Sequence, residues 1–454
     1  MTVLPGTQPA RKLGLEETFG GLYLERCQVD TPAAIVRAVW NHVRDLRQGR
    51  ELKVVDFGAG DGRFSHDGDY ASYVGYEVDR SRYADVKLPP RARLVHACAF
   101  DHPITDADLC IGNPPFVRNQ DLPNGWAREV AGKLCDRTGV LLSGLANAWQ
   151  YFFLLALASV KDDGLCALIL PYEWVGRPSS ARLRNYIEVN RWNVSVYRLA
   201  ETTFAGVLTT SSITIVDKSS RNGLWRYYEE ARSGEFRRLI SVTGGRAGML
   251  PYGRRPDPTS ATPRAIRGLS PGTQAVLTLR EADRARFDLK IGTDVVPCIT
   301  SLRSVDEECE NLDAATFNEL YRDAGARCWL PRTDRPVGPR LLHYLKSIDP
   351  SRYQTKTCLE REVWWKFNMP PVPIMLLSQG FTGRTPKVVH NEYQVRAVGG
   401  VCGIYGLDEE AARRVRTRLR AENVGRRVVR HSNGLMKIEI GQLNALLPQL
   451  AVED

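Results

Sequence analysis

The chain has 454 residues, of which 43% are hydrophobic and 25% are charged, an ordinary composition for a folded protein of two or three domains. No apolar run reaches the ~20 residues of a membrane-spanning helix, and the N-terminus lacks the basic and apolar segments of a signal peptide, so we expect a cytoplasmic protein without a membrane partner. Its ten cysteines occur without a Cys-x-x-Cys pair or clustered histidines, which argues against a metal site, and its net charge of +10 permits a polyanionic partner.

The first predicted elements lead to a glycine-rich loop. Residues 31–40 predict a packing helix with Pro32 in its first turn. Residues 52–57 then predict a strand, and residues 58–62, Gly-Ala-Gly-Asp-Gly, follow it at once. Glycines let the backbone turn tightly and approach a ligand at the carboxyl end of a first strand. A dinucleotide fingerprint would have another glycine at position 63, where this chain has Arg63, so a pyrophosphate cradle is less favoured.

Two further predicted strands end beside polar residues. The second strand, residues 73–76, ends in Glu77, which is placed to accept hydrogen bonds from two ribose hydroxyls. The alternative is that Glu77 is only a solvated strand end. The third strand, residues 93–97, precedes Cys98 and Asp101.

The fourth predicted strand, residues 109–111, leads into the tetrapeptide Asn-Pro-Pro-Phe at residues 113–116. Asn113 offers a side-chain carbonyl, Pro114 a backbone carbonyl without an N–H of its own, and Phe116 an aromatic face. Together they can accept both protons of an amino group and stack on the ring that carries it. This suits attack by the exocyclic amine of a planar heterocycle. An isolated Asn-Pro dipeptide is more often only a turn, and the glycine loop and Glu77 upstream favour the functional reading.

The pattern of alternating strands and helices continues and predicts an α/β fold with a doubly wound, mostly parallel sheet. In such a sheet the carboxyl ends of the strands open onto one crevice, where ligands bind. Phe204 stands just ahead of the last predicted strand. The remaining predicted elements of this domain are a buried helix over 147–160, a strand over 165–170, a helix over 179–189 and a strand over 209–216.

The second half of the chain is rich in arginine. Residues 226–270 predict a basic connector that follows a phosphate backbone, or a solvated linker. Trp364 lies in a stretch that places aromatics beside a base, and Arg414 and Arg418 belong to an arginine stripe over residues 413–430. A single arginine-rich helix is most often a solvated face. We place contact with nucleic acid somewhat ahead of that alternative.

With these motifs in this order, the chain resembles the S-adenosylmethionine-dependent DNA adenine-N6 methyltransferases of the gamma arrangement, the TaqI-like enzymes. The match is detailed over roughly residues 28–216 and otherwise rests on domain order and on residues 384–392, which resemble a strand of the family's recognition domain. The resemblance implies a Rossmann-like class I methyltransferase fold followed by an α+β target recognition domain. The implied divisions are an N-terminal arm (1–30), a catalytic domain (31–225), the connector (226–270) and the recognition domain (271–454).

The resemblance also implies residue roles. Where the family often has an acidic residue that contacts the cofactor's adenine, this chain has Cys98, so either Asp101 swings in or that contact is lost. Phe204 would touch the flipped base, whereas Trp364, Arg414 and Arg418 are our candidates for DNA contact. The implied catalytic motif is Asn113, Pro114, Pro115 and Phe116, and the implied S-adenosylmethionine ligands are Thr31, Pro32, Asp56, Gly58, Gly60 and Glu77, with Cys98 or Asp101.

The expected function is site-specific methylation of a flipped adenine in double-stranded DNA, in a bacterial or archaeal nucleoid, with a cognate restriction endonuclease as a further partner. We expect no appended nuclease domain. The tetrapeptide also fits an RNA adenine or protein-glutamine N-methyltransferase, which the long arginine-rich half disfavours. A non-catalytic nucleic-acid-binding protein on a degenerate methyltransferase fold is a third possibility, supported only by Cys98.

Overall fold

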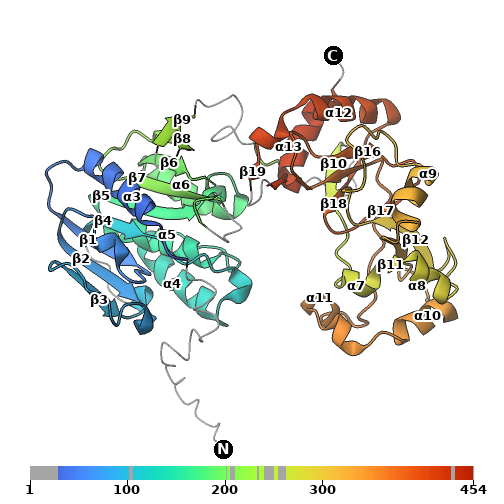
Figure 1. Cartoon of the computed structure of the whole chain (residues 1–454), viewed down its shortest axis with the longest axis horizontal. Helices are drawn as coiled ribbons and strands as arrows, with labels where there is room; N and C mark the ends of the chain where they lie inside the picture. Colours follow the sequence, from blue (N-terminus) through green and yellow to red (C-terminus); the bar gives the residue numbers. More distant parts are fainter. Residues whose placement is uncertain are drawn as a thin grey trace, which may run out of the picture. The chain divides into compact units, whose positions relative to one another are not determined.

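The computed structural model of the chain describes residues 29–101, 106–200, 202–204, 210–232, 235–239, 250–253, 262–430 and 435–452. The expected N-terminal arm therefore lies outside the described residues except for its last two positions. The chain forms two compact units, Met1–Ser241 and Val242–Asp454 (Figure 1). In the part of the chain that the structure describes, no helix is both long and apolar enough to span a membrane.

The first unit is built on one sheet. Its strands are Leu52–Phe57 (β1), Tyr70–Glu77 (β2), Ala92–His96 (β3), Ala107–Gly112 (β4), Val160–Pro171 (β5), Asn193–Arg198 (β6), Ser211–Asp217 (β7), Trp225–Arg232 (β8) and Glu235–Arg238 (β9). They lie in the order β3-β2-β1-β4-β5-β7-β6-β8-β9. Strands β1 to β5 pair in parallel, whereas β7 runs antiparallel to both β5 and β6. The predicted doubly wound, mostly parallel sheet is confirmed.

The strand order contains the switch point that positions a ligand crevice. From β1 the chain builds outward through β2 and β3 and then returns to place β4 on the other side of β1. Asp56 of β1 is thereby in register with both Gly75 of β2 and Ile111 of β4. In a doubly wound sheet, the carboxyl ends of the strands beside such a switch point frame a ligand crevice.

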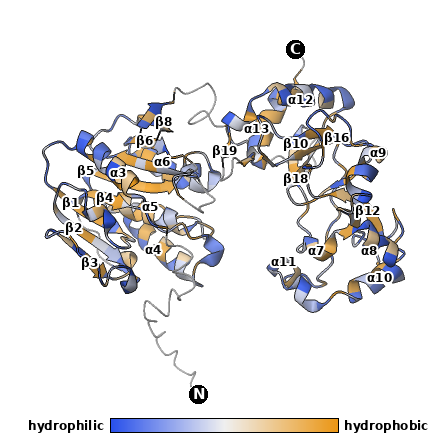
Figure 2. Cartoon of the chain, in the orientation of Figure 1, coloured by the Kyte–Doolittle hydropathy of each residue, from blue (hydrophilic) through white to orange (hydrophobic). Residues whose placement is uncertain are grey.

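Helices cover the sheet because their apolar faces match it. They are Ala33–Leu46 (α3), Trp126–Thr138 (α4), Ala148–Ser159 (α5) and Ala181–Val189 (α6). From α3, Val39 and Trp40 join a core with Leu109 and Ile111 of β4. Helix α5 is buried around most of its circumference and begins with a capping box between Asn147 and Gln150. Figure 2 shows the most apolar residues along the central strands and polar residues along the outer helices.

The structure differs from the sequence analysis at the end of the first unit. Residues 226–238 were expected to begin a connector, but those that the structure describes lie in β8 and β9 at the edge of the sheet. The reason is that β8 pairs in parallel with β6, a strand that the sequence analysis also missed, and buries Tyr227. Of the remaining expected connector, residues 240–249 and 254–261 lie outside the described residues.

The second unit combines short strands and helices in three small sheets, as an α+β domain does. Its sheets have the orders β10-β18-β14-β16, β11-β13-β12-β17 and β15-β20-β19. The residues that resemble a recognition-domain strand include β16. The strands are Arg264–Arg267 (β10), Leu279–Arg280 (β11), Val295–Ile299 (β12), Arg327–Pro331 (β13), Met375–Ser378 (β14), Gly380–Phe381 (β15), Val388–His390 (β16), Arg396–Ala397 (β17), Val401–Tyr405 (β18), Val429–Arg430 (β19) and Met436–Lys437 (β20).

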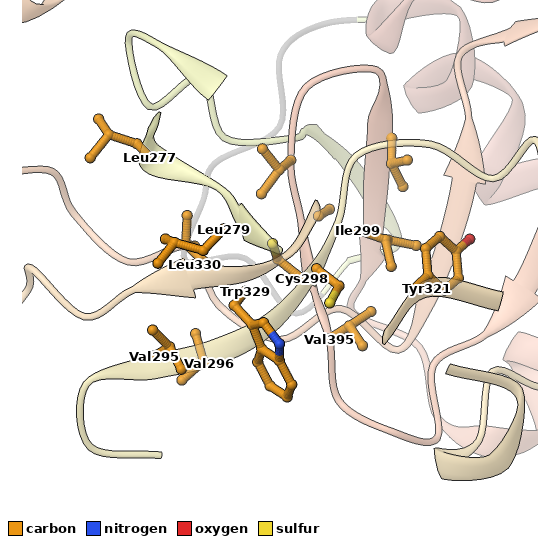
Figure 3. Close-up of a cluster of buried hydrophobic side chains, with 14 of the residues drawn as sticks. Leu277, Leu279, Val295, Val296, Cys298, Ile299, Tyr321, Trp329, Leu330 and Val395 are labelled. Carbon is orange, nitrogen blue, oxygen red and sulfur yellow. The ribbon is translucent and has the colours of Figure 1, made fainter. Parts of the chain in front are cut away.

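Two hydrophobic cores hold the second unit together. One, drawn in Figure 3, packs Leu279, Cys298 and Ile299 around Trp329 and Tyr321. The other joins Met375 and Leu377 of β14 to apolar residues of the last two helices. The helices are Gln274–Leu277 (α7), Glu281–Arg286 (α8), Ala314–Phe317 (α9), Pro339–Lys346 (α10), Lys356–Leu359 (α11), Glu409–Ala421 (α12) and Ile440–Ala451 (α13).

Candidate active site

A cleft of about 910 Å³, counting the part open to solvent, lies at the carboxyl ends of β1, β2 and β4. It lies in the first unit, at the switch point of the sheet. Residues predicted from separate motifs meet in its wall: Gly58, Gly60, Glu77, Cys98, Asn113 and Pro115. The strand ends thus bring together side chains that lie up to 57 positions apart in the chain.

The glycine loop after β1 contacts the end of β2 and the turn after β4. Gly58 and Gly60 have φ values of +79° and +58°, a left-handed conformation that favours glycine. A Cβ atom on Gly58 would lie 3.3 Å from Cδ of Pro115, so the loop packs directly on the Asn-Pro-Pro-Phe turn. The N–H of Gly60 donates a 2.8 Å hydrogen bond to Oε2 of Glu77. The loop therefore connects the ends of β2 and β4.

Glu77 is held in place by backbone donors. Its Oε1 accepts hydrogen bonds from the N–H groups of Val78 at 2.8 Å and Asp79 at 2.9 Å, and its Oε2 accepts the bond from Gly60. A carboxylate has about four acceptor positions, so three backbone donors leave capacity for a ligand hydroxyl. The carboxylate is fixed before any ligand arrives.

Asp56 lies beneath the cleft and supports the turn after β4. It is fully buried, and Oη of Tyr73 donates a 2.6 Å hydrogen bond to its Oδ2. Burial raises the pKa of Asp56 to about 7, although the hydrogen bond from Tyr73 opposes the rise. Within the described residues its Oδ1 has no hydrogen-bond partner. A Cβ atom on Gly112 would lie 2.2 Å from this oxygen, so only glycine fits at the position before Asn113.

Asn113 is oriented by a short segment ahead of α3. Its Nδ2 donates to Oγ1 of Thr31 at 3.1 Å and to the carbonyl oxygen of Val29 at 3.4 Å. Thr31 is buried, and Pro32 directly precedes the helix, with its carbonyl accepting from the N–H of Ile35 at 2.9 Å. The predicted residues Thr31 and Pro32 thus lie next to the tetrapeptide, while Val29 lines the cleft.

The rest of the tetrapeptide packs against the sheet. Pro114 is buried, and Phe116 is partly buried against the core that includes Trp40 and Leu109. Phe204 is buried in that same core.

Part of the cleft wall is aromatic, and the sequence analysis did not predict this part. Phe100 packs edge to face on Trp126, with ring centroids 5.4 Å apart, and on Phe152, with centroids 4.8 Å apart. All three line the cleft. They come from the segment after β3, from α4 and from α5, so no spacing in the sequence could have associated them. The only available signal was their aromatic character near the tetrapeptide.

The structure separates the two candidates for contact with the cofactor's adenine. Cys98 lines the cleft, and burial raises the pKa of its thiol. Asp101 instead forms an ion pair with Lys133 of α4 at 2.9 Å. Of the two residues, it is Cys98 that lies at the cleft.

The remaining predicted site residues lie in the second unit and have structural partners there. Trp364 stacks on Tyr353 with ring centroids 4.0 Å apart and an interplanar angle of 6°. Arg414 forms an ion pair with Glu410 at 3.0 Å. Arg418 donates a 3.1 Å hydrogen bond to the carbonyl oxygen of Leu450, near the end of α13.

Comparisons with known proteins point to one group of enzymes. Residues 102–202 match the model of a family described as Eco57I restriction-modification methylase. The chain is 28% identical over 233 residues to the Type II methyltransferase M.XamI of Xanthomonas campestris pv. amaranthicola, covering 44% of this chain and 41% of that protein. It is 19% identical over 314 residues to the Type II methyltransferase M.AccI of Acinetobacter calcoaceticus, covering 59% of this chain and 54% of that protein. The chain spans about half the length of these curated relatives.

Among solved structures, the Type IIL restriction-modification enzyme MmeI in complex with DNA is similar with a TM-score of 0.52 and 12% identity, over 82% of this chain and 59% of that one. At this identity the similarity concerns the fold. The first unit has a Rossmann-like fold, with a doubly wound, mostly parallel sheet. The tetrapeptide lies inside the segment that matches the family model, and over part of its length the chain is similar to restriction-modification methyltransferases.

Proposed function

We propose that this chain is a DNA adenine-N6 methyltransferase that uses S-adenosylmethionine and serves as the modification enzyme of a restriction-modification system. The observation that carries the proposal is the position of Asn113, whose carboxamide lies in the wall of a cleft that also contains the glycine loop and Glu77. The order of the motifs, cofactor loop before tetrapeptide, supports the gamma arrangement.

The cleft fits S-adenosylmethionine in shape and chemistry. Glu77, fixed by three backbone N–H groups, would use its remaining acceptor position for a ribose hydroxyl. The aromatic wall of Phe100, Trp126 and Phe152 suits the flat apolar face of a purine. At Gly58, where a side chain would meet Pro115, the bare backbone permits close approach to the methionine part. When bound, the cofactor supplies an electrophilic methyl group on a sulfonium.

The residues of the chain then prepare the acceptor amine. Oδ1 of Asn113 and the carbonyl oxygen of Pro114 accept the two hydrogens of the adenine amino group, which localises the nitrogen lone pair. Phe116 stacks on the base. An adenine inside a duplex cannot reach this site, so the base is flipped out of the stack at a cost of a few kcal/mol. Catalysis is mainly positioning, and no strong base is required.

Several features support duplex DNA as the substrate. The sequence relatives are named as Type II methyltransferases, and the structural neighbour MmeI was solved in complex with DNA. A net charge of +10 favours a polyanion. We assign target recognition to the second unit, with Trp364, Arg414, Arg418 and, from the first unit, Phe204 as candidate contacts. A restriction endonuclease that cuts at the same site is the corresponding partner, in the cytoplasm.

The test is transfer of labelled methyl from S-adenosylmethionine to unmethylated duplex DNA, followed by digestion to nucleosides. The parent chain is expected to yield N6-methyladenine, and Asn113→Ala at least about 100-fold less at similar cofactor affinity. Gly132→Ala, in α4 with no atom within 4 Å of the added Cβ, is the matched control and is expected to retain full activity. Label on RNA or on a protein, with none on DNA, would contradict the proposal.

A further inference from the structure

The segment of residues 29–32, here called the strap, is fastened to the loops of two different strands. Oδ1 of Asp30 pairs with Nη2 of Arg82 at 2.6 Å, and Oδ2 of Asp30 pairs with Nη2 of Arg63 at 3.1 Å. Arg63 follows the glycine loop of β1, whereas Arg82 follows β2. One carboxylate therefore joins the strap to the segments that follow β1 and β2.

The two arginines are themselves fixed. Asp61 receives two hydrogen bonds from the side chain of Arg63, from Nε at 2.8 Å and from Nη2 at 2.6 Å. Burial acts to raise the pKa of Asp61, but Arg63 lowers it below its ordinary value. Arg82 lines the cleft and lies over Gly60, where an added Cβ would be 3.2 Å from its Nη2. The side chains of Arg63 and Arg82 are 26% and 21% exposed, whereas that of Asp30 is 58% exposed, so the guanidinium groups are partly buried and solvent reaches the carboxylate.

Arg63 also holds the backbone of the strap, because its Nη1 donates a 2.7 Å hydrogen bond to the carbonyl oxygen of Thr31. The side chain of Thr31 in turn accepts from Nδ2 of Asn113 at 3.1 Å. The carbonyl oxygen of Val29 can only accept, so the atom of Asn113 that faces it is the nitrogen. Both contacts turn the amide nitrogen of Asn113 toward the strap and leave its Oδ1 for the acceptor amine.

We propose that Asp30, clasped between Arg63 and Arg82, is a positioning residue that holds the strap at the cofactor cleft, and that Thr31 fixes the amide of Asn113 for catalysis. The inference rests on the proposed function for the role of Asn113. This arrangement also assigns a structural role to Arg63, which stands where a dinucleotide-binding loop would have glycine. One short segment thus contacts both the arginines beside the cofactor loop and the catalytic amide.

The first measurement needs no DNA. Calorimetric binding of S-adenosylmethionine is expected to be about tenfold weaker in Asp30→Asn, a change that keeps the size of the side chain and removes its charge. The matched control is Asp69→Asn, which breaks a comparable ion pair of 2.8 Å with Arg44 away from the cleft and is expected to bind like the parent. If Asp30→Asn and Asp69→Asn bind S-adenosylmethionine with equal affinity, the clasp is overturned. It is also overturned if the parent chain binds no S-adenosylmethionine. Thermal melting checks that each variant folds.

The second measurement separates turnover from binding. Thr31→Val removes the oxygen that Asn113 contacts and is expected to lower kcat about tenfold while the Kd for the cofactor stays within about twofold. Thr31→Ser keeps that oxygen and is expected to restore most of kcat. A kcat of Thr31→Val equal to that of the parent would overturn the role of Thr31. If Asp30→Asn loosens the cofactor but the parent methylates no DNA, the clasp stands and the proposed function fails.

Discussion

Two regions were predicted as functional: the motifs at the strand ends of the first unit and the arginine-rich helix α12 of the second. Their side chains have different kinds of surroundings in the structure. Gly58, Glu77 and Asn113 come from three strands and line one cleft. In α12, Arg416 pairs with Glu310 at 3.0 Å, and Arg418 binds the carbonyl oxygen of Leu450. Motif residues placed by the backbone meet at a site, whereas long side chains on a helix find structural partners.

The difference has a physical cause. The end of a parallel strand fixes the position and direction of the next residue, so a short side chain there has little freedom. An arginine has a long flexible stem, and its guanidinium can reach any acceptor within its range. Its sequence position therefore predicts little about its contacts.

The largest effect concerns the buried carboxyl beneath the cleft. Burial raises the pKa of Asp56 to about 7 from 3.8. The folded chain thus binds this proton more tightly than the unfolded chain, and the resulting stability is complete below pH 3.8 and is lost as the pH rises through 7. Three pKa units correspond to about 4 kcal/mol. Between pH 4 and 7.5 we expect the free energy of unfolding to fall by about this much more in the parent than in Asp56→Asn.

Urea unfolding at several pH values measures this difference. The control is Asp69→Asn, which changes an exposed carboxylate and is expected to keep the pH dependence of the parent. Parallel curves for the parent and Asp56→Asn would show that Asp56 is ionised in the folded protein throughout this range.

The next effect is steric. In Gly112→Ala the new Cβ would lie 2.2 Å from Oδ1 of Asp56, and the φ of +145° is unfavourable for alanine. Overpacking and backbone strain together are expected to cost about 3 kcal/mol of stability and to displace Asn113, so activity falls as well. Gly132→Ala lies in a helix with free space around the added atom and is expected to be neutral or slightly stabilising. Equal unfolding midpoints for the two variants would contradict the contact.

Glycine, proline and β-branched residues determine the conformation of the local backbone. Their patterns therefore predicted the parallel sheet and the part of the cleft formed by the glycine loop, Glu77 and Asn113. The first strand was predicted with its observed bounds, Leu52–Phe57. The aromatic half, Phe100, Trp126 and Phe152, could not be predicted, since it forms only when three separate segments pack together. The clasp at Asp30 was missed for the same reason. Strands β6, β8 and β9 were missed because their polar residues obscure the apolar pattern.

A smaller effect is expected at the end of β2. Glu77→Gln replaces a carboxylate oxygen by an NH₂ group, which cannot accept from the N–H groups of Gly60, Val78 or Asp79. We expect the Kd for S-adenosylmethionine to rise about 30-fold. Glu51→Gln, which weakens an exposed ion pair with Arg91 of 3.3 Å, serves as the control. A change below about twofold in calorimetry would show that Glu77 does not contribute to cofactor binding.

The smallest effect tests the arginine-rich helix. Arg418 donates hydrogen bonds to the carbonyl oxygens of Leu450 and Val452, at the C-terminus of α13, where a cation also interacts favourably with the helix dipole. Arg418→Ala is expected to cost about 1 kcal/mol of stability in the second unit. Arg413 is exposed on the same helix, and Arg413→Ala is expected to leave the melting temperature unchanged. If either arginine contacts a phosphate, its replacement by alanine would lower the salt dependence of DNA binding by about one ion. If Arg418→Ala alone changes that dependence while melting like the parent, the arginine contacts DNA rather than α13, and the contrast between the two regions disappears.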